Sequence, residues 1–128
     1  MLRLQRNRDN SSAKSTEFPF VHPQSLKEVA GIILLKGITF IYKHSTRCSA
    51  SLFAMKRLIA AEPSEDERWL YIDVVAQRSL SLVLAEELNV WHESPQLIML
   101  VDGKVTVHGS HHRVNEMTVE EWRRVAKN

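Results

Sequence analysis

The sequence alternates between two periodicities, and this alternation restricts the possible folds more than any other feature. Four short segments rich in β-branched, aromatic or alternating apolar residues indicate strands: residues 38–43, 69–74, 96–101 and 104–108. Apolar residues at helical spacing precede, separate and follow them, in residues 26–33, 48–61, 80–88 and a segment from residue 118 onwards. The predicted order is therefore helix, strand, helix, strand, helix, strand, strand, helix.

This order predicts the topology of a sheet. The first two strands are joined through a helix, so we expect a parallel pair with a right-handed crossover. Asp102-Gly103 separates the last two strands and is typical of a two-residue hairpin, so that pair is expected to be antiparallel. The predicted fold class is α/β, with a mixed four-stranded sheet and helices on both faces.

Three helix starts carry capping residues. Ser25 followed by Glu28 has the spacing of a capping box, and so has Thr118 followed by Glu121. Ser79 is the expected N-cap of the third helix.

The chain contains one cysteine, Cys48, among 128 residues. A single cysteine excludes an internal disulfide, a self-contained dithiol site, and a zinc site of the Cys₄ or Cys₃His type. The thiol stands where the first predicted strand passes into a helix, and the free amides and dipole of a helix start favour a thiolate. The alternative interpretation is a small apolar residue packed in the core.

The residues around Cys48 favour a reactive thiol. Lys43, His44 and Arg47 precede it, and no acidic residue lies between residues 29 and 61. Ser51 completes a C-x-x-S spacing, in which serine replaces the second thiol that would resolve a mixed disulfide. An outside thiol would then have to complete each reaction cycle.

Pro95 is the second expected part of the site. Ser94-Pro95 enters the third strand beside the end of the first, where a cis bond would present the Ser94 backbone to a substrate bound at Cys48. The alternative is an ordinary proline at a strand entry, where its missing N–H does no harm.

Two sequence strings resemble a known family. Tyr42–Ser49 reads YKHSTRCS and His92–Gln96 reads HESPQ, and together with the predicted layout they resemble the monothiol bacilliredoxin family, a branch of the thioredoxin fold. Arg78-Ser79 and Ser110-His111 also fit its pattern, and the resemblance extends from about Ser25 to the C-terminus. Ser49-Ala50 departs from it, because family members often carry other residues there, proline included.

The resemblance implies a monothiol thiol–disulfide oxidoreductase that removes bacillithiol, or a similar low-molecular-weight thiol, from protein mixed disulfides. Cys48 would take up the bacillithiol, and a second bacillithiol or another redoxin would release it. Ser94 and Pro95 would align the substrate, and Ser51 would belong to its binding site. The charge of Lys43, His44 and Arg47 would stabilise the thiolate or meet the acidic malate part of bacillithiol. Expected partners are S-thiolated proteins and the small thiol, with no bound cofactor and a monomeric chain.

Two other functions remain open on the sequence. Monothiol redoxins can hold an iron–sulfur cluster between two protomers, each giving one cysteine. A redox-sensing interaction protein would use Cys48 as a modified switch rather than a catalyst. His108, His111 and His112 are interpreted as surface or substrate-facing residues and not as a metal site, because neighbouring strand residues point to opposite faces.

The charge distribution separates the first residues from the rest. Residues 1–14 hold four of the 17 basic and one of the 15 acidic residues, so the remainder is nearly neutral. No basic face with interleaved aromatic residues is evident, so nucleic-acid binding is not expected. Without a secretory signal or an apolar run long enough to span a membrane, a cytoplasmic location is expected. We expect residues 1–20 to be a disordered extension and residues 21–128 to be the thioredoxin-like domain.

Overall fold

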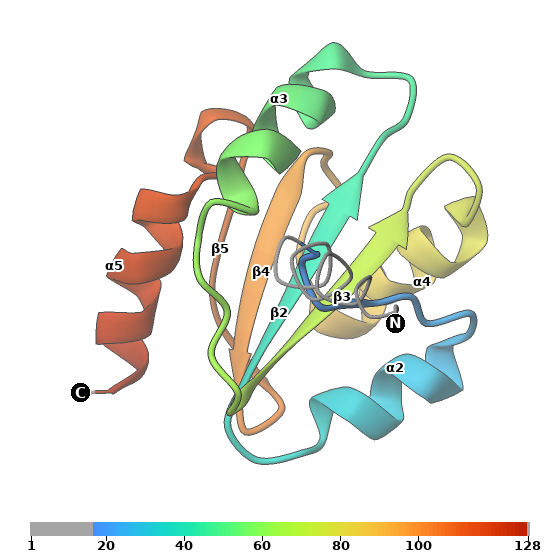
Figure 1. Ribbon diagram of the computed structural model, residues 1–128. Helices are drawn as coiled ribbons and strands as arrows, with labels where there is room; N and C mark the ends of the chain where they lie inside the picture. Colours follow the sequence, from blue (N-terminus) through green and yellow to red (C-terminus); the bar gives the residue numbers. More distant parts are fainter. Residues whose placement is uncertain (1–16, 128) are drawn as a thin grey trace, which may run out of the picture.

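A five-stranded mixed sheet forms the middle layer of the structure, a computed structural model that describes residues 17–127 (Figure 1). Across the sheet the order is β1-β3-β2-β4-β5. The strands are β1 (Phe20–Val21), β2 (Ile38–His44), β3 (Glu67–Asp73), β4 (Gln96–Val101) and β5 (Lys104–Ser110). Strands β1, β3 and β2 are parallel, while β4 is antiparallel to both β2 and β5. The predicted mixed sheet is confirmed, with one strand more than the four expected.

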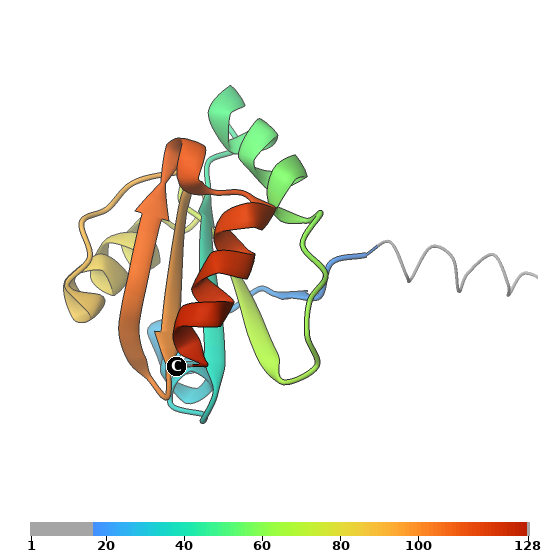
Figure 2. The same ribbon diagram turned by 90° about the vertical axis from the view of Figure 1, so that its left-hand side faces the viewer.

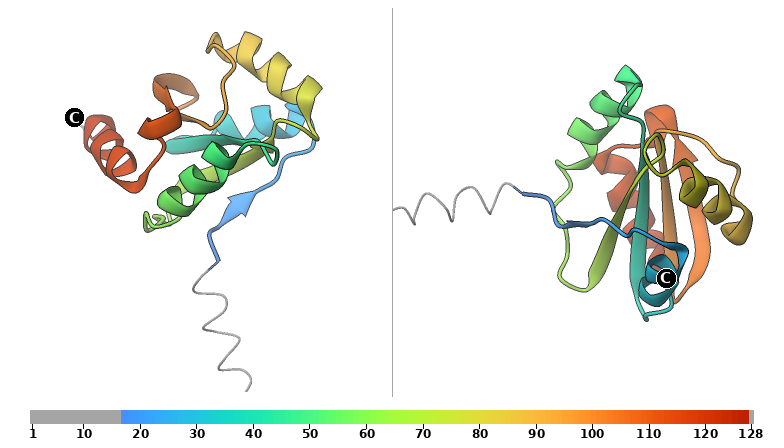
Figure 3. Two further views of the ribbon diagram at one scale, coloured as in Figure 1. Left: turned by 90° about the horizontal axis from the view of Figure 1, so that it is seen from above. Right: turned by 90° about the vertical axis from the view of Figure 1, so that its right-hand side faces the viewer.

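Helices cover both faces of this sheet, as the side view and the view from above show (Figures 2 and 3). They are α2 (Leu26–Ile33), α3 (Ser49–Leu58), α4 (Arg78–Leu88), α5 (Glu116–Ala126) and the 3₁₀ turn η1 (His111–Arg113). Phe40 and Tyr42 pack with α3 and α5, whereas Ile41 packs with α2 and α4, because side chains along β2 alternate between the faces. Within residues 17–127, no helix is long and apolar enough to cross a membrane.

The additional strand is β1, which sequence reasoning did not predict. It pairs with β3 over two residues, too few to produce the alternating pattern of a strand. The ring of Phe18 lies 4.8 Å from that of Trp69, and the ring of Phe20 stacks 6.0 Å from that of Tyr42. The aromatic packing of the chain therefore begins inside the segment assigned to the extension; residues 1–16 of that segment lie outside the described residues.

The N-cap of α2 is confirmed, and the N-cap of α5 differs from the prediction. Ser25 Oγ accepts a hydrogen bond from the Glu28 amide at 3.2 Å. At α5 the cap is Asn115, whose side chain accepts from the Thr118 amide at 2.9 Å. Thr118 is therefore a buried residue of the first turn and not the cap. Asparagine caps as well as threonine does, so the motif alone could not place the helix start.

The start of α4 also lies earlier than predicted. Its N-cap position is Gln77, which makes no side-chain capping bond, and Ser79 lies inside the helix. Asp73 organises the preceding turn, because its carboxylate accepts from the amides of Val75 and Ala76 at 2.9 and 3.0 Å. The turn is thus closed from the end of β3, which a search for caps beside the helix does not detect.

The hairpin between β4 and β5 is the one that its sequence predicts. Asp102 and Gly103 both have positive φ, 52° and 85°, as a type I′ turn requires. The Asp102 carboxylate also accepts a hydrogen bond from the Gly37 amide at 2.7 Å, which joins this hairpin to the loop before β2.

Candidate functional site

Helix α3 follows β2 after a short loop (Figure 1), and Cys48 occupies its N-cap position, at the predicted helix start. Its amide donates to the Ser45 carbonyl at 3.2 Å, and its own carbonyl accepts from the Ser51 amide at 3.1 Å. The side chain is half-buried and makes no capping hydrogen bond. The thiol therefore lies at the positive end of the helix dipole, beside amides of the first turn that have no intrahelical acceptor.

Ser51 faces the interior and not the solvent. It is fully buried, and its Oγ accepts from the Ser45 amide at 3.1 Å. This bond closes the loop that carries Cys48, since it joins the end of β2 to the first turn of α3. The structure thus places Ser51 beneath the candidate site, where it holds the loop rather than contacting a ligand from outside.

Tyr42 and His44 lie side by side under the start of α3. The Tyr42 hydroxyl donates to the Ser51 carbonyl at 3.1 Å and lies 2.8 Å from His44 Nδ1. The His44 ring also packs against the Tyr71 ring, with centroids 5.5 Å apart. Burial raises the pKa of Tyr42, helped by nearby Tyr71 and Cys48, so the phenol stays protonated.

His44 is neutral at physiological pH in this setting. Burial lowers its pKa, and the nearby Asp73 carboxylate only partly opposes that effect. Sequence reasoning selected His44 for its charge and missed Tyr42. The signal for Tyr42 was available, because residues two apart on a strand point to the same face.

Lys43 lies on the opposite face of the sheet, away from Tyr42 and His44. Its side chain is 0% exposed, and its Nζ donates to the Ser81 carbonyl of α4 at 3.1 Å. It also lies 3.5 Å from His92 Nδ1. Burial lowers the pKa of Lys43 to about 8. The grouping of Lys43 with the two other basic residues around the thiol is therefore corrected, because strand alternation separates it from them.

His92 links α4 to the segment before β4. Its Nδ1 lies 3.2 Å from the Ser81 hydroxyl. Burial, with the positive charges of Lys43 and Arg78, lowers the pKa of His92. The contact between the His92 and Ser81 side chains thus holds the segment that leads to Pro95 against α4.

Ser94 and Pro95 lie at the same end of the sheet as Cys48. The Ser94-Pro95 bond is cis, and Gln96 pairs with Lys43, which places Pro95 beside the last residue of β2. The Pro95 carbonyl accepts from the His111 amide at 2.9 Å, so η1 is attached to this segment. The expected neighbourhood of the Pro95 segment and the end of β2 is thus present.

Arg47 is exposed in the loop directly before Cys48, and its amide donates to Ser45 Oγ at 3.3 Å. It is the one member of the predicted basic trio with an exposed side chain, since Lys43 and His44 are buried. The structure therefore places Arg47 and Cys48 in the loop after β2, at the same end of the sheet as the Pro95 segment. Ser51 lies buried beneath this loop, and Pro95 is itself buried.

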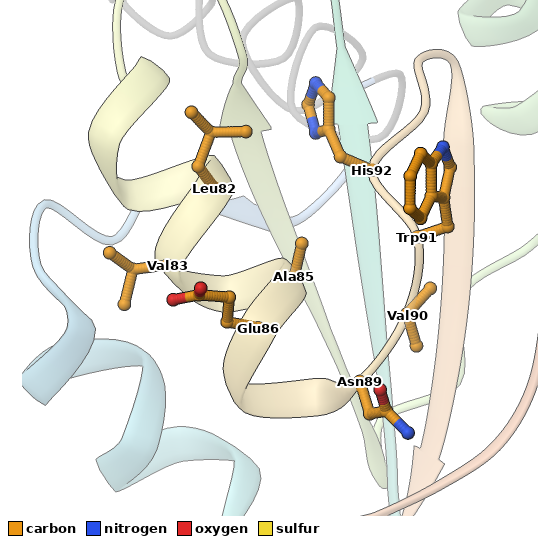
Figure 4. Close-up of a pocket in the computed structure, with 8 residues that line it drawn as sticks. All are labelled: Leu82, Val83, Ala85, Glu86, Asn89, Val90, Trp91 and His92. Carbon is orange, nitrogen blue, oxygen red and sulfur yellow. The ribbon is translucent and has the colours of Figure 1, made fainter.

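A shallow pocket of about 580 Å³ lies between α4 and the segment before β4 (Figure 4). Trp91 is 83% exposed and flanks it. The lining residues are Leu82, Val83, Ala85, Glu86, Asn89, Val90, Trp91 and His92. The pocket is mainly apolar, and its lining residues come from α4 and the four residues that follow this helix directly in the sequence.

The histidines after the hairpin are not gathered into a ligand set in the described part of the chain. There, no three histidine, cysteine or acidic side chains are placed so that they could hold a metal ion. His111 lies instead beside Pro95, through its backbone amide.

A mixed sheet of this topology, with a cysteine at a helix start and a cis-proline entering β4 at the same end of the sheet, is that of a thiol–disulfide oxidoreductase of the thioredoxin fold. A family model described as monothiol bacilliredoxin BrxC matches residues 24–119. The chain therefore belongs to the monothiol bacilliredoxin family, as the motifs around Cys48 and Pro95 indicated.

Solved structures agree on the fold. A structure described as a putative oxidoreductase with a thioredoxin fold is 26% identical, with a TM-score of 0.75, covering 82% of this chain and 94% of its own. Mitochondrial thioredoxin 3 from Saccharomyces cerevisiae is 18% identical, with a TM-score of 0.66 and coverage of 83% and 94%. A thioredoxin from Trypanosoma brucei brucei is 15% identical, with a TM-score of 0.66 and coverage of 88% and 96%.

Proposed function

We propose that this oxidoreductase removes bacillithiol, or a similar small thiol, from protein mixed disulfides, with Cys48 as the nucleophile. The observation that carries the proposal is the position of the lone thiol, half-buried at the start of α3 and not engaged in capping the helix. The sequence holds no second cysteine, so the chain cannot form an internal disulfide in its cycle.

The reaction consists of two thiol–disulfide exchanges. The Cys48 thiolate attacks the bacillithiol sulfur of the mixed disulfide, and the protein thiolate leaves and takes up a proton from solvent. The product is a disulfide between Cys48 and bacillithiol. A second small thiolate then attacks the bacillithiol sulfur, which releases Cys48 as a thiolate and yields the disulfide of the two small thiols.

The surrounding residues have distinct parts in this proposal. Arg47 is exposed beside the thiol and is suited to the acidic malate part of bacillithiol. Ser94 and Pro95 would align the substrate beside the end of β2. Ser51 acts indirectly, since its hydroxyl holds the loop closed. The small thiol is a co-substrate, and no bound cofactor is needed.

The test is a discharge assay with a bacillithiolated protein as substrate. Reduced enzyme is mixed with it, and the masses of both proteins are followed by mass spectrometry. We expect Cys48 to gain one bacillithiol while the substrate loses one, and added bacillithiol to restore free Cys48. The Cys48→Ser variant is the matched control. Substrate release equal to that control would refute the proposal, and a parallel run with a glutathionylated substrate identifies the preferred small thiol.

A further inference from the structure

The outer face of α3, next to Cys48, carries large apolar side chains. The helix buries Ser51, Ala54 and Leu58, and Met55 packs against the core, so the remaining residues between them face outwards. Leu52 is 53% exposed and Phe53 is 58% exposed. Both follow Cys48 by about one helical turn, a rise of roughly 6 Å. Large apolar side chains therefore stand beside the candidate site.

Basic side chains continue this face. Lys56 and Arg57 occupy the last turn of α3 and are exposed. They lie one turn beyond Leu52 and Phe53, so the four side chains form one stripe along the helix. We call these four residues the α3 outer face.

The surroundings of the α3 outer face are also basic. Arg47 precedes Cys48, and the turn η1, which packs beside α3, carries exposed His112 and Arg113. Arg113 pairs with Glu121 of α5 at 3.6 Å, so Arg47 supplies the main positive charge here. No acidic residue occurs between residues 29 and 61, which include β2, the Cys48 loop and the whole of α3. Arg47, Lys56 and Arg57 are exposed on the Cys48 loop and α3, so positive charge is presented on the surface beside the thiol.

We propose that the α3 outer face docks the protein that carries the mixed disulfide, and that it selects partners with an acidic, partly apolar segment beside the thiolated cysteine. The inference rests on the proposed function. Charge complementarity identifies the occupant, because a positive surface accelerates encounter with a negative partner. A second copy of this chain is disfavoured, since its own α3 outer face would bring like charges together.

The test uses two synthetic peptides, each with one cysteine in a mixed disulfide with bacillithiol. One is flanked by aspartate and leucine and the other by lysine and leucine. We expect the second-order rate constant for the acidic peptide to exceed that for the basic peptide by about tenfold at low salt. The ratio should fall towards one as salt is added, because exposed charges are screened.

Two double variants locate the effect. K56E/R57E changes the α3 outer face, and K27E/K36E makes the same change of net charge at exposed positions on α2 and after it. The first should abolish or invert the preference for the acidic peptide, and the second should retain it. Both should react with a small neutral disulfide at the wild-type rate, because neither touches Cys48. Equal losses of preference in the two variants would overturn the proposal.

Other outcomes separate this proposal from the proposed function. If the wild-type enzyme discharges both peptides at equal rates, the docking surface is refuted while the proposed function stands. Discharge of neither peptide refutes both. If sedimentation shows a wild-type dimer that K56E/R57E dissociates, the α3 outer face is occupied by a second copy and the proposal is wrong.

Discussion

Lys43 shows at the scale of one residue how burial alters a charge. Its ammonium is removed from water and donates to a neutral partner, the Ser81 carbonyl, at 3.1 Å. A buried charge without an opposite charge is costly, which is why the pKa of Lys43 falls from 10.5 to about 8. The folded protein bears this cost below that pKa.

We therefore expect Lys43→Met to stabilise the protein at neutral pH by about 1–3 kcal/mol, because methionine fills a similar volume without charge. Between pH 8 and 10.5 the unfolded wild-type chain binds more protons than the folded one. The free energy of unfolding of the wild-type protein therefore increases as pH rises through this range. The stability difference between Lys43→Met and the wild type becomes smaller as a result.

Urea unfolding of both proteins, at about pH 7 and about pH 10, measures this difference. Lys36→Met, at an exposed lysine, is the matched control and should change little at either pH. If the difference in the free energy of unfolding between wild type and Lys43→Met does not vary with pH, the buried charge of Lys43 is not its cause.

Tyr42 carries the second prediction at this scale. Tyr42→Phe removes the hydroxyl that donates a hydrogen bond to the Ser51 carbonyl. It also leaves the buried His44 Nδ1 without this hydroxyl as a partner. We expect a loss of about 1–3 kcal/mol in the free energy of unfolding. Tyr71→Phe keeps the ring packing on His44 and serves as the control; an equal effect of both substitutions would argue against the role of Tyr42.

At the scale of helices and strands, sequence patterns predicted the features that depend only on neighbouring residues. The Asp102-Gly103 hairpin and the Cys48 helix start depend on short-range rules and are found where predicted. The start of α5 was misplaced because both Asn115 and Thr118 are able to cap a helix, and the start of α4 because Asp73, at the end of β3, closes the turn before it. Strand alternation would have assigned Lys43 and His44 to opposite faces, but their shared charge obscured it.

The cap of α5 can be tested directly. Asn115→Ala removes the acceptor for the Thr118 amide, and we expect a loss of about 1 kcal/mol in the free energy of unfolding. Asn115→Asp should recover most of it, because a carboxylate accepts the same bond and complements the helix dipole. Thermal or urea unfolding of the three proteins distinguishes capping from a general effect of substitution. If aspartate fails to restore stability, the side-chain cap is not what Asn115 contributes.

At the scale of the whole molecule, β1 extends the sheet and adds aromatic packing at one edge. Phe20 stacks on Tyr42 at 6.0 Å and meets Tyr71 at 5.4 Å, so an N-terminal residue contacts the same rings that lie under the candidate site. Such a contact spans more than twenty residues of sequence and no local pattern contains it. This is why the sheet was predicted with four strands.

Phe20→Ala tests whether this contact contributes to the fold. We expect the free energy of unfolding to fall by about 1–3 kcal/mol. This loss is smaller than that for replacing a fully buried phenylalanine by alanine, because Phe20 is only partly buried. Val21→Ala, in the same strand but 44% exposed, should cost much less. Equal effects of the two substitutions would mean that the aromatic contact adds nothing to stability.

The burial of Ser51 also affects how readily this site could hold a second thiol. A single substitution, Ser51→Cys, would give the chain the two-thiol spacing of a self-resolving enzyme. It would also replace the oxygen that receives the Ser45 amide with sulfur, a much weaker acceptor. A second thiol at this position would therefore disturb the loop that presents Cys48. The local architecture of the loop thus favours a single thiol at this site.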